Sequence, residues 1–108
     1  MAIQVAEEIA QPAQAEIELG PVLHALSDPV RLKIVAALAA SKDPLPCGGF
    51  NVSVTKSTCT HHFKVLREAG VIHQRHEGTA RLNSLRRDDL EARFPGLLET
   101  ILQGSGLR

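Results

Sequence analysis

The chain of 108 residues has few aromatic residues, few cysteines and no net charge. Its aromatic residues are three Phe, so the core must be built mainly from Leu, Ile, Val and Ala. Proteins that bind single-stranded nucleic acid usually stack bases on aromatic rings, and this chain offers few such rings. The hydrophobic share of 44% is nevertheless that of a globular protein, and the length fits one domain.

Long apolar runs and secretion signals are also lacking. The longest apolar run, residues 34–40, is far shorter than the roughly 20 residues that cross a bilayer. The first 19 residues hold four Glu and no Lys or Arg, unlike the basic start of a secretory signal. Two cysteines, Cys47 and Cys59, do not form the disulfide framework of a small secreted domain. We therefore expect a cytoplasmic protein with no membrane partner.

Catalytic motifs do not stand out. The sequence shows no glycine-rich phosphate loop, no carboxylate pair and no nucleophile with a base and an orienting partner. An enzyme that uses Cys47 as a nucleophile with a nearby His would lack a recognisable orienting group. We expect no enzymatic activity.

The zero net charge hides an uneven distribution. Residues 54–87 contain seven Lys or Arg residues against two Glu residues, which gives this block a charge of +5, whereas both flanking parts are acidic. A basic block of this kind is typical of a surface that binds a polyanion. The alternative is a solvated helix face beside a charged hairpin.

Helix and turn signals predict a mainly α-helical domain with one small β-hairpin. Asp28 before Pro29 is typical of a helix start, and the apolar residues that follow predict a helix to about residue 40. Thr55 and Gly70 are a suitable N-cap and stop for a helix over residues 56–69. The remaining expectations are a short helix over 21–27 with Pro21 at its first position, a loop over 41–53, strands over 71–85 around a turn at Glu77–Gly78, and one or two helices over 87–103 with a break at Pro95. Residues 1–19 are expected to form an arm or a dimerisation helix, residues 20–103 the domain, and residues 104–108 a frayed tail.

The helix over 56–69 carries two different faces. Cys59, Phe63 and Leu66 fall on one face, and the opposite face presents hydroxyl, imidazole and ammonium groups. Such groups can reach base edges and phosphates in a major groove. The alternative is an ordinary amphipathic surface helix, but short polar side chains favour helix less than Glu and Lys do, which points to a functional reason. Basic residues near the tip of the predicted hairpin could likewise hold phosphate, unless the hairpin only covers the core.

Two runs resemble the ArsR/SmtB family of bacterial transcriptional regulators. LHALSDPVRLKIVAAL, residues 23–38, is similar to the family's opening helices, and VTKSTCTHHFKVLREAGVI, residues 54–72, is similar to its recognition helix and the exit into the wing. The Glu-Gly pair at 77–78 matches the wing turn. The resemblance covers residues 22 to about 85 and implies a winged helix-turn-helix, with recognition helix 56–69, wing 71–85 and C-terminal helix 87–103.

This resemblance implies a homodimer, joined by its first and last helices, that binds double-stranded DNA at an imperfect palindrome in a promoter. It implies that DNA is bound by Lys56, Ser57, Thr58, Thr60, His61 and Lys64 of the helix and by Arg75, Thr79 and Arg81 of the wing. The apolar residues expected at the dimer interface are Ile3, Ile9, Leu97, Leu98, Ile101 and Leu102. His62 lies towards the flank of the helix, and we expect it to pack.

The chain departs from the family at its metal-sensing sites. One metal site of the family uses a Cys-x-Cys pair in the helix before the recognition helix, where this chain has only Cys47 in a Pro/Gly-rich loop. A second family site uses histidines in the last helix, but residues 86–108 contain no His. His73 and His76 are three residues apart, which puts them on opposite faces of a strand. The cofactor is therefore left unassigned. The one candidate is a transition metal ion, nickel or zinc, at a site outside the family pattern, with His24, Cys47 or the wing histidines as candidate ligands.

Two alternatives stay open. Cys47 is either a plain loop cysteine or a thiol that senses a metal or an oxidant, whereas Cys59 is expected to pack as a small core residue. The competing function is a protein-interaction or metal-buffering module that uses the winged fold without reading DNA. In that case the apolar stripe from Leu97 to Leu102 would be the working surface.

Overall fold

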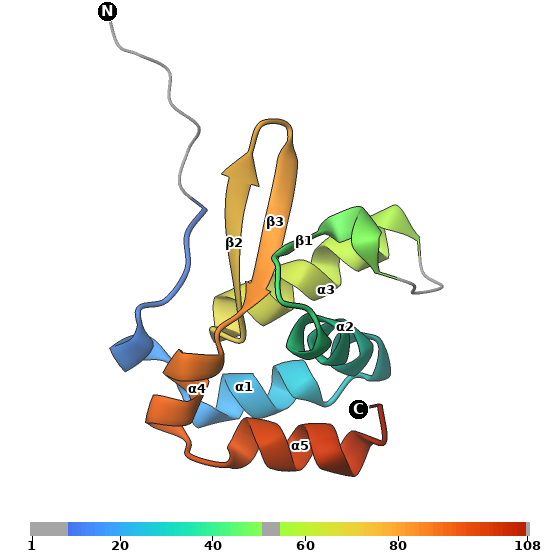
Figure 1. The fold of residues 1–108 in the computed structure, drawn as a ribbon. Helices are drawn as coiled ribbons and strands as arrows, with labels where there is room; N and C mark the ends of the chain where they lie inside the picture. The colour runs from blue at the N-terminus through green and yellow to red at the C-terminus, as the bar shows by residue number, and fades with distance from the viewer. Residues whose placement is uncertain (1–8, 51–54, 108) are drawn as a thin grey trace, which may run out of the picture.

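The computed structural model describes residues 9–50 and 55–107 and is mostly helical, with a small antiparallel sheet (Figure 1). The elements are, in chain order, the 3-10 helix η1 (Gln14–Glu16), α1 (Leu19–Leu26), α2 (Pro29–Ala40), β1 (Leu45–Pro46), the 3-10 helix η2 (Cys47–Gly49), α3 (Lys56–Ala69), β2 (Ile72–Glu77), β3 (Ala80–Leu85), α4 (Arg87–Arg93) and α5 (Leu97–Ser105). This arrangement is a winged helix-turn-helix, as predicted. None of the described helices is long and apolar enough to span a bilayer.

Local capping explains where α2 begins. The Asp28 carboxylate accepts hydrogen bonds from the backbone N–H groups of Val30 and Arg31, at 2.9 and 3.0 Å. Pro29 occupies the first turn, where it needs no hydrogen-bond donor. The predicted start of this helix is confirmed.

Two other helix boundaries differ from the prediction. α1 begins at Leu19 rather than at Pro21, so the proline lies at the third helical position, within the first turn where a missing N–H does no harm. α5 continues to Ser105, so Gly104 and Ser105 are helical and not part of a frayed tail. The break at Pro95 is confirmed, because α4 and α5 are separate helices and Gly96 between them has a φ of +80°.

The hairpin turns one residue later than predicted. Glu77 pairs with Ala80, so the two loop residues are Gly78 and Thr79 rather than Glu77 and Gly78. Gly78 has a φ of +61°. The φ of Thr79 is not positive. A positive φ at the first loop residue alone fits a type II′ turn, which places Gly at its first central position. Residues 41–50 also contain a strand that was not predicted, since β1 pairs antiparallel with β3 through Leu45 and Asn83.

The described part of the N-terminal segment, from residue 9 onward, packs against its own domain. The Gln11 side-chain amide donates to the Gln74 carbonyl at 2.7 Å and accepts from the Gln74 N–H at 2.8 Å, so it pairs with the free edge of β2. Arg86 donates to the Pro12 carbonyl at 2.6 Å. Of the two predicted forms, an arm or a dimerisation helix, residues 9–17 take the form of an arm; it is not frayed but lies along β2 and contains η1 (Figure 1).

The core lies where α1, α2, α3, α5 and the base of the sheet meet. It is built mainly from Leu, Ile, Val and Ala, as predicted, with Phe63 as its one fully buried aromatic residue within the described chain. Ile17 closes the core on the side of the N-terminal segment. The hairpin projects from this body, with α3 beside its base (Figure 1).

Candidate nucleic-acid interface

The third helix, α3, has well-defined ends. The Thr58 N–H donates to the Thr55 hydroxyl oxygen at 3.2 Å, which caps the N-terminus. At the other end Gly70 has a φ of +86°, and the N–H of Val71 donates to the Leu66 carbonyl at 3.0 Å. These caps stop the helix where the sequence predicts, and they set its length and its angle to the hairpin.

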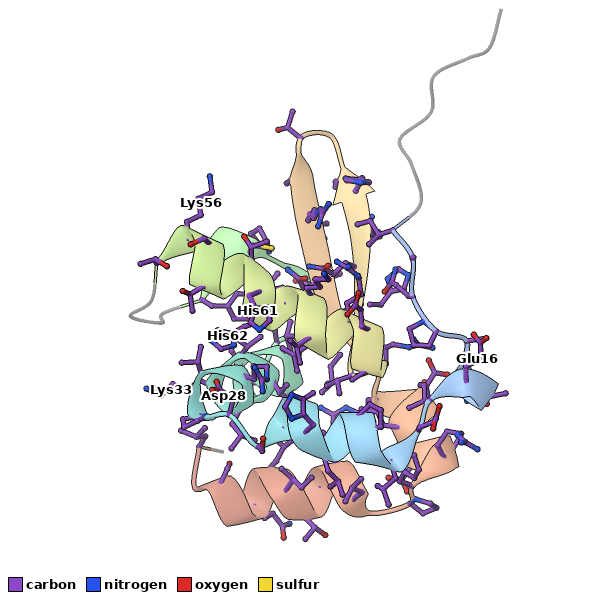
Figure 2. All side chains as sticks on the ribbon, turned by 180° about the vertical axis from the view of Figure 1, so that it is seen from behind. Glu16, Asp28, Lys33, Lys56, His61 and His62 are labelled. Atoms are coloured by element: carbon purple, nitrogen blue, oxygen red, sulfur yellow. The ribbon has the colours of Figure 1, made fainter. Side chains whose placement is uncertain are left out.

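The exposed side of α3 carries the predicted polar side chains. All six predicted DNA-binding residues of the helix are exposed to solvent. Figure 2 shows Lys56 at one end of the helix and His61 near its middle. The set, termed here the α3 face, consists of Lys56, Ser57, Thr58, Thr60, His61 and Lys64. The buried side consists of His62, Phe63, Leu66 and Ala69. The face therefore offers hydroxyl, imidazole and ammonium groups to solvent.

Two hydroxyls of the α3 face are already oriented. The Thr60 hydroxyl donates to the Lys56 carbonyl at 3.0 Å, and the Thr55 hydroxyl donates to Thr58 Oγ1 at 2.8 Å. Thr60 can therefore present its oxygen as an acceptor, and Thr58 can present its O–H as a donor. Acceptors suit amino groups of bases and donors suit phosphate oxygens.

A buried polar cluster holds α3 against α1 and α2. His62 is buried, as predicted, and its Nδ1 lies 3.2 Å from Arg31 Nη1 and 3.8 Å from Asp28 Oδ2. Arg31 also donates to the carbonyls of Ala25 at 2.7 Å and His24 at 3.2 Å, at the end of α1. Figure 2 shows Asp28 just before α2 and His62 on α3. One guanidinium thus joins three helices and fixes the direction in which the α3 face points.

The Asp28 carboxyl group has an altered acidity. Burial by itself would raise its pKa, but the hydrogen bond from the Arg31 N–H, the charges of His62 and Arg31, and the Val30 N–H together lower the pKa below its ordinary value. The carboxylate is therefore charged at neutral pH and serves both as the α2 cap and as a partner of the cluster.

The predicted wing residues are all exposed but do not share one face of the hairpin. Arg75 pairs with Leu82 in the strand register and Arg81 pairs with His76, so the two arginines point to opposite sides of the sheet. Arg81 lies on the same side as Gln74, whose side-chain oxygen accepts from Arg67 of α3 at 2.8 Å. Arg81 is therefore the wing cation on the α3 side.

A buried joint that the sequence patterns did not predict connects the hairpin to the rest of the interface. Gln74 and Asn83 face each other across β2 and β3, are almost fully buried, and are joined by a hydrogen bond of 2.6 Å. Asn83 also donates to the Leu45 carbonyl at 3.0 Å. Two amide residues on strands that are otherwise apolar at the buried positions are the signal that could have revealed this joint.

The basic block does not act as one patch. Arg67, Arg86 and Arg87 donate hydrogen bonds to Gln74, Pro12 and Ala39 and so serve the fold. Arg75 pairs with Glu77 at 2.7 Å, but both groups are exposed, so this pair is weak and exchangeable. Within the part of the chain that the structure describes, the cations of the block whose side chains have no partner are Lys56, Lys64 and Arg81. The charge available to a polyanion is thus concentrated on α3 and the inner side of the hairpin.

Among the described residues the candidate metal ligands form no cluster, and the predicted dimer residues divide between the core and the surface. Cys47 and Cys59 are free and half-buried, and no group of three or more His, Cys, Asp or Glu gathers within residues 9–50 and 55–107. Leu98 and Leu102 are buried in the chain's own core, whereas Leu97, Ile101 and Ile9 are half-buried. Ile3 lies outside the described residues.

Comparison with known proteins adds to this geometry. Residues 26–75 match the family model described as Helix-turn-helix domain. The chain is also 40% identical over 82 residues to YceK, an uncharacterized HTH-type transcriptional regulator of Bacillus subtilis (strain 168); the match covers 74% of this chain and 82% of that protein. The matched region contains α2, α3 and the start of β2, which are the elements that build and hold the α3 face.

Proposed function

Because the chain belongs to the helix-turn-helix transcriptional regulators, we propose that it binds double-stranded DNA at promoters, with the α3 face in the major groove and the hairpin over adjacent phosphates. The observation that carries this proposal is the α3 face itself. It holds six exposed polar side chains on a helix that is capped at both ends and fixed to α1 and α2 by Arg31. The resemblance of residues 23–38 and 54–72 supports placing the protein in the ArsR/SmtB branch.

Charge on the interface supports duplex DNA rather than another ligand. Lys56 lies at the N-terminal end of α3, Lys64 two turns further along, and Arg81 on the inner side of the hairpin. Cations spaced along a helix and a neighbouring hairpin can follow a phosphate backbone while the hydroxyls between them reach base edges. Few exposed aromatic rings are available for base stacking, which favours a duplex over a single strand.

Charge removal on α3 tests this proposal. We expect Lys64→Ala to lower the affinity for the DNA upstream of the protein's own gene, because a charge-assisted contact to phosphate is lost. The expected loss is roughly 1.5 kcal/mol, about tenfold. The measurement is fluorescence anisotropy with labelled duplex. Lys42→Ala is the matched control, since Lys42 is an exposed lysine outside α3 and the hairpin. Equal affinities of the two variants would show that the α3 face is not the DNA-binding surface.

We also propose that the protein acts as a homodimer on a palindromic operator. Leu19 and Leu23 of α1 are each 45% exposed, and half-buried Leu97 and Ile101 add apolar surface on α5. α1 and α5 both lie at the end of the molecule opposite the hairpin tip (Figure 1). A second copy that covers this surface would leave both α3 faces free to contact half-sites one DNA turn, roughly 34 Å, apart.

Footprinting on upstream DNA tests the dimer model. The expected pattern is two protected half-sites whose centres are about 10 base pairs apart or a multiple of that spacing. One protected half-site would contradict the dimer but not the use of α3. The same assay with added nickel or zinc tests whether binding responds to a metal ion, with loss or gain of protection as the readout.

A further inference from the structure

A cavity lies between η2 and the N-terminal half of α3, and both cysteines line it. Its volume is about 370 Å³. Phe50 and Phe63 form an apolar wall, with ring centroids 5.2 Å apart, and Lys56 and Thr60 of the α3 face also line it. The cavity is therefore in direct contact with two residues of the proposed DNA-binding surface.

The two sulfur atoms influence each other across this cavity. Burial raises the pKa of the Cys59 thiol, and the negative charge of an ionised Cys47 raises it further. Cys47 is held in place because the Asn83 side-chain amide donates to its Sγ at 3.5 Å. Cys59 is held by its position in the second turn of α3. The fold thus brings two free thiols from separate elements to one apolar cavity.

We propose that Cys47 and Cys59 form a dithiol site that a small hydroperoxide oxidises to a disulfide within one chain, and that this disulfide weakens DNA binding by α3. The second half of this inference rests on the proposed function, whereas the disulfide itself does not. A small hydroperoxide fits the site because the cavity is mainly apolar, is lined by both cysteines and has room for a small molecule.

The oxidation balances as two successive displacements. The Cys47 thiolate attacks one peroxide oxygen; the S–O bond forms, the O–O bond breaks, and the departing alkoxide takes up a proton to leave as an alcohol. Cys59 then gives up its proton while its sulfur attacks the sulfenic sulfur; the S–S bond forms, the S–O bond breaks, and water leaves. The two thiols lose two electrons, which reduce one hydroperoxide. Cys47 attacks first because the raised pKa of Cys59 keeps that group a thiol.

The disulfide would alter the α3 face through the position of η2. A disulfide holds its two Cα atoms roughly 4.4–6.8 Å apart, so the bond clamps η2 against the second turn of α3. Lys56 and Thr60 line the cavity that this clamp closes. We expect weaker DNA binding because η2 then crowds the approach of a phosphate to Lys56 and pulls on the first turns of the helix.

Peptide mapping tests the site without DNA. The full-length protein is treated with hydrogen peroxide or cumene hydroperoxide, alkylated, digested and analysed by mass spectrometry. The expected product is a Cys47–Cys59 linked peptide in a monomeric chain that has lost two hydrogen atoms, and dithiothreitol should restore both thiols. Two unmodified thiols, a disulfide between chains, or oxidation of one cysteine alone would overturn the proposal.

DNA affinity before and after oxidation tests the consequence. The oxidised protein should bind upstream DNA about tenfold more weakly, within the usual range of coupling between sites, and Cys47→Ser should bind like the reduced protein with no response to peroxide. Two replacements of Cys59, Cys59→Ala and Cys59→Val, are compared, because either one alone could disturb the packing of α3. A peroxide response in Cys47→Ser, or unchanged affinity of the disulfide form, would overturn the regulatory half. A Cys47–Cys59 disulfide in a chain that binds no DNA when reduced would overturn the proposed function and support the dithiol site alone.

Discussion

At the residue scale, the Asp-Pro-Val-Arg-Leu run, residues 28–32, contributes to the interface without belonging to it. Asp28 caps α2, and Arg31 donates to the last carbonyls of α1 and to His62 of α3. A buried guanidinium with several acceptors fixes geometry well, because each lost partner would leave a buried donor unsatisfied. The run therefore sets where the α3 face points.

The pH dependence of stability should reflect Asp28. Its pKa in the folded chain is below the ordinary value, so its contribution is complete above a pH of about 4 and is lost as the pH falls through the folded value. Asp28→Asn keeps an acceptor for the cap but removes the charge, so its unfolding free energy should fall less steeply in acid. Asp28→Ala should in addition lose about 1 kcal/mol at neutral pH. Urea unfolding at several pH values measures both, and parallel acid profiles for wild type and Asp28→Asn would contradict this account.

Gly70 should be irreplaceable for two separable reasons. Its φ of +86° costs any other residue about 1 kcal/mol, and a Cβ there would lie 2.6 Å from Ile17 Cγ1. We expect Gly70→Ala to lower the free energy of unfolding by this amount. Overpacking by the added Cβ should lower it by roughly a further 1–3 kcal/mol. Gly96→Ala is the matched control, because Gly96 has the same left-handed conformation, with a φ of +80°, but nothing lies within 4 Å of the added atom. Equal losses of unfolding free energy in urea would show that Ile17 does not press on Gly70.

At the scale of elements, the helices were predictable and the strand pairings were not. α2 and α3 carry their own caps and apolar faces, so a few adjacent residues determine where they begin and end. The pairing of β1 with β3 joins residues 38 positions apart, and the Gln11 contact with Gln74 spans 63. Such contacts depend on the assembled domain, which no local pattern in the sequence encodes.

The same distinction applies to the candidate interface. The exposed residues of α3 follow from helical periodicity, and the structure places them as predicted. The division of the wing between its two faces follows from strand pairing: Arg81 faces His76 in the observed register and would face Gln74 with the turn at residues 77–78, so it lies opposite Arg75 in either case. Arg75 and Arg81 were grouped by their nearness to the hairpin tip, which does not specify the face on which each side chain lies.

The hairpin should contribute to DNA binding mainly through its inner side. Arg81 has no side-chain partner among the described residues and lies on the α3 side, whereas Arg75 points to the other side and pairs with Glu77. We expect Arg81→Ala to weaken binding of upstream DNA several-fold more than Arg75→Ala does. Anisotropy titrations of the two variants under identical salt make the comparison. A larger loss for Arg75→Ala would mean that the outer face of the hairpin contacts DNA.

At the scale of the whole molecule, the hairpin tip lies at one end and α1 and α5 lie at the other, with α3 between them (Figure 1). Leu19→Glu with Leu23→Glu should convert a dimer to a monomer, measured by light scattering after size-exclusion chromatography, because charges then replace exposed leucines. Circular dichroism provides the control for folding. A wild-type chain that is monomeric at all accessible concentrations would contradict the dimer model.

The salt dependence of DNA affinity tests the central claim most directly. If the α3 face neutralises phosphates, the logarithm of the association constant should fall linearly with the logarithm of salt concentration, and Lys56→Ala or Lys64→Ala should each reduce the slope by about one. Lys42→Ala should leave the slope unchanged. Binding that is insensitive to salt, or slopes that are the same for wild type and both α3 variants, would contradict the assignment of this helix to DNA.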